Sequence, residues 1–155
     1  MNWRDYLEMV VEPAKTVCAG YDLPYQCVVA QGAIESQWGT YGIGNGGFNI
    51  FGRKYGGDFD YVLMDTDEDD GQGNLYEIQA KFVSYPSMDD AINDWCQLMI
   101  WRSEDGSTDY LQYAEQYWKD HDLEAFCRGI AGVYATDIRY GDKIMNTIEE
   151  IGEDM

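Results

Sequence analysis

The chain has 155 residues, a size typical of one domain that buries its own core. Its formal charge of −19 argues against binding to nucleic acid or to an anionic membrane surface, because both interactions need clustered Lys and Arg. No segment approaches the ~20 consecutive apolar residues of a membrane-spanning helix. Arg4, Asp5 and Glu8 interrupt the N-terminal segment, so we expect no signal peptide there.

Hydrophobic spacing predicts a mostly helical chain with one small β unit. Five glycines in residues 42–52 (GIGNGGFNIFG) favour a loop that lets the backbone approach a ligand closely. Ser87 and Asp90 resemble a capping box at the start of a helix. The pattern predicts a single α+β domain over residues 1–155. We expect helices at 3–18, 24–38, 88–101, 109–118, 122–131 and 140–151, and a β-hairpin formed by strands 59–64 and 75–83.

The acidic segment DTDEDDGQGNLYE, residues 65–77, lies at the tip of the predicted hairpin. An EF-hand loop that starts at Asp65 needs Gly at its sixth position and Glu at its twelfth. This sequence holds Asp70 and Tyr76 there, and Gly71 and Glu77 each come one residue late. We therefore predict a solvated hairpin tip in place of a calcium site.

The cysteine and histidine pattern argues against a metal centre. Cys18, Cys27, Cys96 and Cys127 include no CxxC pair, and His121 is the single histidine. We therefore expect no zinc site and no cofactor. The even number of cysteines permits two disulfides outside the cell, but helix-like apolar patterns around two of them favour buried free thiols.

Glu35 is the acid whose surroundings point most directly to chemistry. It lies in QGAIESQWG, residues 31–39, near Ile34 and Trp38 and at the end of a predicted helix. Apolar neighbours and the negative end of the helix dipole both favour a protonated carboxyl group. Such a group can protonate a leaving oxygen. A glutamate on the wet face of an amphipathic helix is the alternative that residue type alone leaves open.

Several motifs in order resemble the glucosaminidases of glycoside hydrolase family 73, found in bacteria and phages. AQGAIESQWGTYGIGNGGFNIFG, residues 30–52, is similar to the family pattern A-x-x-E-S-x-W-G followed by N-x-F-G. Residues 66–68 (TDE) resemble its T-x-E, residues 80–87 (AKFVSYPS) its F-x-x-Y-x-S, and residues 132–144 (GVYATDIRYGDKI) its G-Y-A-T-D-P-x-Y-x-x-K-I. The resemblance covers about residues 24–151, nearly the whole chain.

The resemblance implies a lysozyme-like fold and hydrolysis of the β-1,4 bond that follows N-acetylglucosamine in peptidoglycan. It implies that Glu35 is the general acid and that Glu68, on the hairpin, is the second carboxylate. Tyr134 would position the N-acetyl group of the substrate or the attacking water. The residues implied at the substrate groove are Trp38, Asn49, Phe51, Asp137 and Tyr140.

Some features of the implied site stay open at this point. Val83 and Ile138 stand where the family often has Arg and Pro. The density of acids around Glu68 leaves Asp67 and Asp69 as alternatives for the second carboxylate. Retaining, inverting and substrate-assisted mechanisms are all compatible with the sequence, because they depend on the separation of the two carboxyl groups.

Three other functions compete with this interpretation. A lytic transglycosylase acts on the same glycan with one catalytic Glu and without water. A cysteine amidase or peptidase needs a nucleophilic Cys and a His base, and His121 with one of the four cysteines is its formal candidate. A module that only binds glycan or protein keeps the groove without the chemistry.

The charge also bears on partners and location. We expect a monomer that acts on glycan strands at the bacterial cell wall. A domain of charge −19 gains no electrostatic steering toward walls that carry anionic polymers. We therefore expect delivery by a larger assembly, such as a phage particle or a secretion or lysis system.

Overall fold

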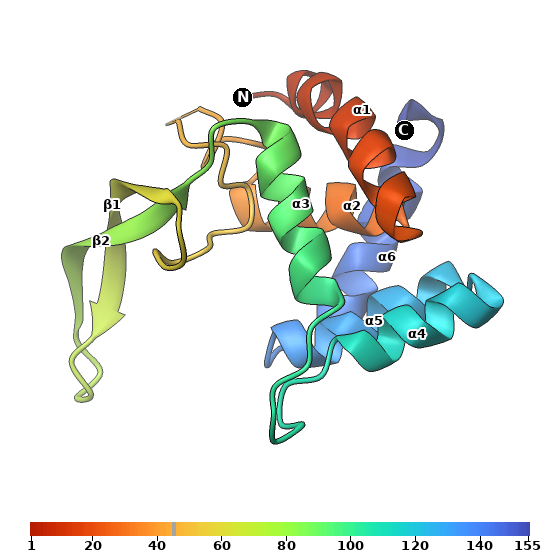
Figure 1. Cartoon of the computed structure of the whole chain (residues 1–155). Coiled ribbons are helices and arrows are strands. Elements are labelled where there is room, and N and C mark those ends of the chain that lie inside the picture. Colours follow the sequence, from red (N-terminus) through yellow and green to blue (C-terminus); the bar gives the residue numbers. More distant parts are fainter. Residues whose placement is uncertain (45) are drawn as a thin grey trace.

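The computed structural model describes residues 1–44 and 46–155, which form a helical body and one β-hairpin (Figure 1). The expected α+β class, mostly α, is confirmed. The helices are α1 (Trp3–Tyr21), α2 (Tyr25–Ser36), α3 (Met88–Met99), α4 (Leu111–Asp120), α5 (Leu123–Tyr134) and α6 (Tyr140–Ile151), followed by a 3₁₀ turn at Gly152–Asp154. The hairpin consists of β1 (Asp60–Asp69) and β2 (Leu75–Ser84).

Several helix ends carry the side-chain caps that define them. Asn2 caps α1 by accepting the N–H of Asp5 at 3.0 Å. Ser87 caps α3 by accepting the N–H of Asp90 at 3.2 Å, so the predicted helix start is confirmed. The Asp90 carboxylate accepts the Ser87 hydroxyl hydrogen, in place of the Ser87 backbone N–H that a capping box would use. The C-terminal bounds were less predictable, since α1 continues past Gly20 to Tyr21 and α2 ends two residues before Trp38.

In the core, α1 packs against both α2 and α3, and α6 packs against α2 and α5 (Figure 1). Tyr6 of α1 is fully buried and donates its hydroxyl hydrogen to Val29 O of α2 at 2.7 Å. All four cysteines are buried in this core, as expected, and the Sγ atoms of Cys18 and Cys96 lie 3.8 Å apart. None of the helices in residues 1–44 and 46–155 is long and apolar enough to span a membrane.

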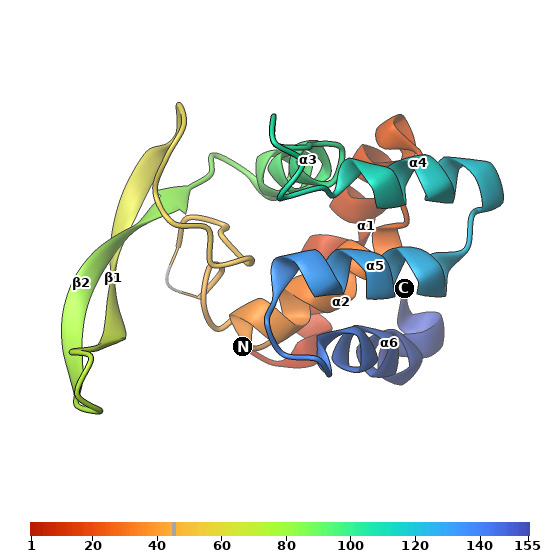
Figure 2. The ribbon, with the colours of Figure 1, turned by 90° about the horizontal axis from the view of Figure 1, so that it is seen from below.

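The hairpin stands off the helical body on the side to which the C-terminal ends of α2 and α5 point (Figures 1 and 2). β1 and β2 pair in an antiparallel register that sets Glu68 opposite Tyr76 and Asp67 opposite Glu77. β1 is longer than the predicted strand 59–64, so Asp65 to Asp69 lie in a strand and only residues 70–74 form the tip. A continuous ladder of backbone hydrogen bonds replaces the expected acidic loop.

The tip is stabilised by one of its own carboxylates. Asp70 accepts the N–H groups of Gln72 at 2.7 Å and Asn74 at 3.2 Å, and these bonds hold the pKa of its carboxyl below the usual value. The Asp70 oxygens therefore serve the turn itself. With the neighbouring acids in a β-ladder, the segment has a conformation unlike that of an EF-hand loop.

Candidate active site

Glu35 occupies the last turn of α2, and the residues after it explain why the helix stops there. Ser36 donates its hydroxyl hydrogen to Gly32 O at 2.6 Å and accepts the N–H of Gly39 at 2.8 Å. Gln37 and Trp38 then adopt left-handed backbone conformations, with φ of 50° and 56°. One serine thus ties the helix end to a sharp turn and leaves Glu35 next to the glycine-rich loop.

The Glu35 carboxylate is held by a residue from the opposite end of the chain. Tyr140, the first residue of α6, donates its hydroxyl hydrogen to Glu35 Oε1 at 2.6 Å. Burial raises the pKa of Tyr140, and the hydrogen bond to the Glu35 carboxylate raises it further, so the phenol stays protonated at neutral pH. Glu35 itself is exposed, as in the alternative of a glutamate on the wet face of an amphipathic helix. The helix turns that face outward.

Tyr134 forms the next part of the same cluster. It is the last residue of α5, its ring centroid lies 5.8 Å from that of Tyr140, and its hydroxyl donates to Phe51 O at 3.1 Å. Burial raises the pKa of Tyr134, and the negative charge of Glu35 adds to the effect. The structure therefore brings together Glu35, Tyr134, Tyr140 and the Phe51 carbonyl, while the Phe51 side chain is buried in the core.

Gln31 supports this cluster from inside the protein and is absent from the residues that the sequence singled out. It is fully buried one helical turn before Glu35, and its Oε1 accepts the indole N–H of Trp95 at 2.8 Å. Its Nε2 has no hydrogen-bond partner in the described part of the chain. The Gln31 amide nevertheless favours the ionised Tyr140 hydroxyl, so it partly offsets the rise in the Tyr140 pKa that burial causes. The spacing of four residues from Glu35 was the signal available in the sequence.

Asn49 builds the loop that borders the cluster. Its side chain is buried, its Nδ2 donates to Arg53 O at 2.8 Å and Val83 O at 3.0 Å, and its Oδ1 accepts the N–H of Arg53 at 2.9 Å. Both amide hydrogens are thus committed to backbone carbonyls. This arrangement favours a scaffolding role over the substrate contact expected from the sequence. A Cβ on Gly42 (φ 94°) would lie 2.4 Å from Asn49 O, so the loop closes on a glycine.

The register of the hairpin separates the candidate second carboxylates. Side chains alternate between faces along a strand, so Glu68 shares a face with Val62, whereas Asp67 and Asp69 lie on the other. The Val62 face meets the glycine-rich loop after α2, because a Cβ on Gly47 would lie 2.9 Å from Val62 Cγ1. Glu68 thus lies on the face turned toward the loop that follows Glu35, together with Asp60 at the other end of β1.

Comparison with known proteins places this geometry in a family. The model of a family described as Glucosaminidase, mannosyl-glycoprotein endo-beta-N-acetylglucosaminidase, matches residues 11–153. The chain belongs to the glucosaminidase family. The suspected family is thereby confirmed.

Individual relatives agree with this assignment. Peptidoglycan hydrolase FlgJ of Escherichia coli K12 is 28% identical over 151 residues, covering 94% of this chain and 46% of the relative. Exo-glucosaminidase LytG of Bacillus subtilis is 27% identical over 145 residues, covering 94% of this chain and 50% of the relative. This glucosaminidase chain thus spans about half the length of these curated relatives.

Solved structures share the fold over nearly the whole chain. The catalytic domain of the autolysin Auto of Listeria monocytogenes has a TM-score of 0.76 at 27% identity, covering 97% of this chain and 85% of that one. The truncated glycoside hydrolase domain of Salmonella typhimurium FlgJ has a TM-score of 0.75 at 24% identity, covering 99% of each chain. At this identity the similarity supports a shared fold and no more. The expected lysozyme-like architecture of this glucosaminidase domain is confirmed.

Trp38 lies in another local setting, whereas Asp137 and Tyr134 line one hollow of about 490 Å³. Trp38 packs edge-on against Tyr6, with ring centroids 5.8 Å apart, and lines a hollow of about 440 Å³ that contains no other predicted site residue. Asp137 accepts the N–H of Arg139 at 2.9 Å and pairs with Lys143 Nζ at 2.8 Å, so its carboxylate organises the start of α6. Ile138, where the family often has Pro, is 97% exposed.

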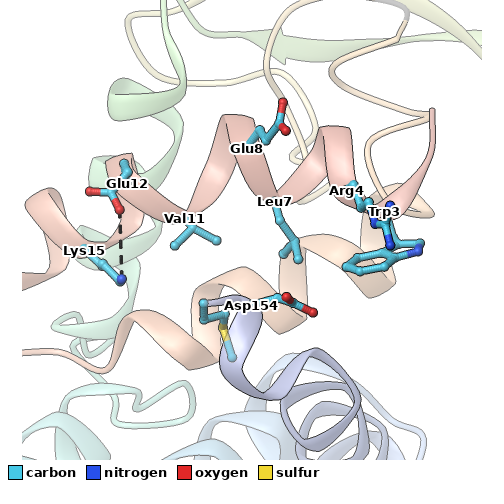
Figure 3. Close-up of a pocket in the computed structure, with 9 residues that line it drawn as sticks. Trp3, Arg4, Leu7, Glu8, Val11, Glu12, Lys15 and Asp154 are labelled. Atoms are coloured by element: carbon cyan, nitrogen blue, oxygen red, sulfur yellow. Dashed lines mark ion pairs between the residues drawn. The ribbon is translucent and has the colours of Figure 1, made fainter.

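A larger hollow, of about 540 Å³, lies between α1 and the C-terminal residues (Figure 3). The ion pair of Glu12 with Lys15, at 3.9 Å, sits at its edge. The lining residues include Trp3, Arg4 and Asp154, and none of the predicted site residues is among them. Size alone therefore does not identify the active site of this glucosaminidase domain.

The geometry also bears on the cysteine-enzyme alternative. His121 is an exposed residue at the C-terminal end of α4, and its Nε2 lies 2.9 Å from Asp22 Oδ2. All four thiols are buried, and burial raises the pKa of Cys27, which disfavours the nucleophilic thiolate. The exposed histidine and the buried thiols therefore do not support a cysteine enzyme.

Proposed function

We propose that this domain is an endo-β-N-acetylglucosaminidase that hydrolyses the β-1,4 bond after N-acetylglucosamine in peptidoglycan, with Glu35 as general acid. The observation that carries the proposal is the Tyr140–Glu35 hydrogen bond of 2.6 Å at the exposed end of α2, in a chain of the glucosaminidase family. Tyr140 occupies Oε1, which leaves Oε2 to carry the proton. That proton passes to the glycosidic oxygen as the bond to the anomeric carbon breaks.

Glu68 is the second carboxylate of the proposal. Its position on the hairpin face that meets the glycine-rich loop supports this role over Asp67 and Asp69. In the hydrolytic step it accepts a proton from water, and the resulting hydroxide bonds to the anomeric carbon. Tyr134 stays neutral because burial and the Glu35 charge raise its pKa. Its hydroxyl hydrogen is donated to Phe51 O, so its oxygen can orient the water or the N-acetyl N–H of the sugar by accepting a hydrogen bond.

The decisive experiment compares the native protein with Glu35→Gln on purified cell wall. The amide cannot donate a proton as a carboxylic acid does, so activity should fall on the order of 100- to 10,000-fold. Unchanged circular dichroism is the control for folding. Substantial residual turnover in a folded Glu35→Gln protein would remove Glu35 from the acid role.

Product analysis separates the proposal from its nearest rival. Mass spectrometry of released fragments should show reducing N-acetylglucosamine ends, because water is the acceptor in a hydrolase. Anhydro-muramic ends would identify a lytic transglycosylase. Large fragments that appear before small ones indicate endo action, whereas immediate release of terminal sugars indicates exo action.

The site of action in the proposal is the bacterial cell wall, with glycan strands as the partner and a monomeric enzyme. The charge of −19 gives no attraction to anionic wall polymers, so delivery falls to a larger phage or secretion assembly. A sedimentation assay on purified walls at low salt tests this part. Tight binding of the isolated domain would contradict assisted delivery.

A further inference from the structure

A small hollow beside α3 contains an exposed tryptophan and two charged groups that the proposed chemistry does not use. It measures about 370 Å³ and is lined by Arg53, Asp94, Gln97, Leu98 and Trp101. Trp101 lies two residues after the end of α3, and its side chain is 48% exposed. A half-exposed indole beside ionic and amide groups offers one apolar face and several polar atoms.

The walls of this hollow are fixed by contacts within the protein. Arg53 Nε lies 3.6 Å from Asp94 Oδ2, and Asp94 also accepts the hydroxyl hydrogen of Tyr85. The main chain of Trp101 is held by the start of α4, because the Trp101 carbonyl accepts the N–H groups of Tyr110 at 3.1 Å and Leu111 at 3.2 Å. The indole is therefore presented by an anchored backbone, which lowers the entropy cost of binding a ligand.

One short loop contacts both the hollow and the proposed active site. Phe51 accepts the Tyr134 hydroxyl through its carbonyl, and Arg53, two residues later, pairs with Asp94. Asn49 holds Arg53 in place through its N–H and its carbonyl. The positive charge of Arg53 also reaches the Tyr134 hydroxyl, where it opposes the rise in pKa that burial causes.

We propose that this hollow is a sugar subsite, in which Trp101 stacks on the apolar face of one N-acetylated ring of the glycan strand, and Arg53 and Gln97 donate hydrogen bonds to its oxygens. The inference rests on the proposed glycosidase function. A pyranose ring matches the hollow because it has a C–H face for the indole and a polar rim for the charged and amide groups. The paired charges make the hollow locally neutral in a chain of charge −19, which suits an uncharged sugar.

The binding test uses the Glu35→Gln protein, which keeps the hollow, and the soluble β-1,4-linked N-acetylglucosamine tetramer. Calorimetry should give a Kd about 10-fold weaker when Trp101→Ala is added, because the stacked face is lost. Adding Trp101→Phe should restore most of the affinity, and Gln97→Ala should weaken it by a smaller factor. Trp118→Ala is the matched control, since Trp118 is 39% exposed on α4, where its indole N–H donates to Tyr21 O.

A kinetic test distinguishes a subsite from damage to the fold. Trp101→Ala alone should raise KM for purified wall about 10-fold with kcat nearly unchanged, as expected for loss of uniform binding. A fall in kcat with unchanged KM would overturn the subsite. The subsite is equally overturned if Glu35→Gln does not bind the tetramer, or if Trp101→Ala does not change its Kd. Wall hydrolysis that survives Glu35→Gln would refute the proposed function, whatever the tetramer data show.

Discussion

Tyr140 donates its hydroxyl hydrogen to Glu35 Oε1 at 2.6 Å and so connects the start of α6 to the end of α2 across 105 positions of sequence. The bond fixes one oxygen of the exposed carboxylate and leaves the other to carry the proton in the proposed mechanism. It gives α6 a direct part in the proposed site. Four of the predicted site residues, Glu35, Phe51, Tyr134 and Tyr140, are brought together around it.

Replacing Tyr140 with Phe tests this relationship. The ring is kept and only the hydroxyl is lost, so the fold should persist while the carboxylate loses its orientation. A hydrogen bond to a charged group is worth about 1.5–3 kcal/mol, so we expect kcat on purified wall to fall about 10- to 100-fold. Tyr113→Phe is the matched control, because Tyr113 is partly buried on α4 and outside the cluster. Wild-type kcat in a folded Tyr140→Phe protein would contradict the role given to Tyr140.

The second carboxylate is tested by neighbours on opposite faces of one strand. Glu68→Gln should lower kcat by at least about 10-fold if Glu68 activates water or stabilises charge. Asp67→Asn removes the same charge one residue away on the other face and should leave kcat within about 2-fold of the native value. Both rates come from turbidity loss of wall suspensions. A reversed result would move the role to Asp67, and two active variants would indicate participation of the substrate N-acetyl group.

Local sequence patterns predicted the parts of this fold that depend on local interactions. The N-cap at Ser87 and the helical body follow from spacing and side-chain type, and both are confirmed. The end of α2 was missed because Ser36, a residue of low helix preference, both receives the Gly39 N–H and bonds back to Gly32. The contact with Gly39 depends on the shape of the turn after the helix, and the spacing of apolar residues along the helix does not predict that shape.

The site was less predictable, because its contacts join distant segments. The Tyr140 bond to Glu35 and the Asn49 bond to Val83 depend on how α6 and β2 pack. The resemblance named Glu68 and left Asp67 and Asp69 as alternatives, and the strand register places those two on the other face. Motif resemblance placed Asn49 at the substrate groove, whereas its contacts favour a structural role.

The Asn49→Ala variant tests whether the side chain of Asn49 stabilises the fold. The change leaves the carbonyls of Arg53 and Val83 and the N–H of Arg53 without their buried partner. We expect the free energy of unfolding, measured by urea denaturation, to fall by roughly 2–3 kcal/mol. Asn146→Ala, on the exposed face of α6, should change it by less than about 0.5 kcal/mol. Equal free energies of unfolding for the two variants would contradict the structural role of Asn49 and favour the substrate contact expected from the sequence.

Asp137 provides a prediction about pH. The ion pair with Lys143 and the bond from Arg139 N–H hold the pKa of its carboxyl below the usual value. A lowered folded pKa contributes stability above the unfolded value of about 3.9, and this stability is lost as pH falls through the folded pKa. The native Tm should therefore exceed that of Asp137→Asn at neutral pH, and the gap should close below about pH 4. A Lys143→Gln background should reduce the Tm difference that Asp137→Asn causes at neutral pH, because it removes the largest cause of the lowered Asp137 pKa. A Tm difference that persists unchanged at low pH would show that the charge of Asp137 does not stabilise the start of α6.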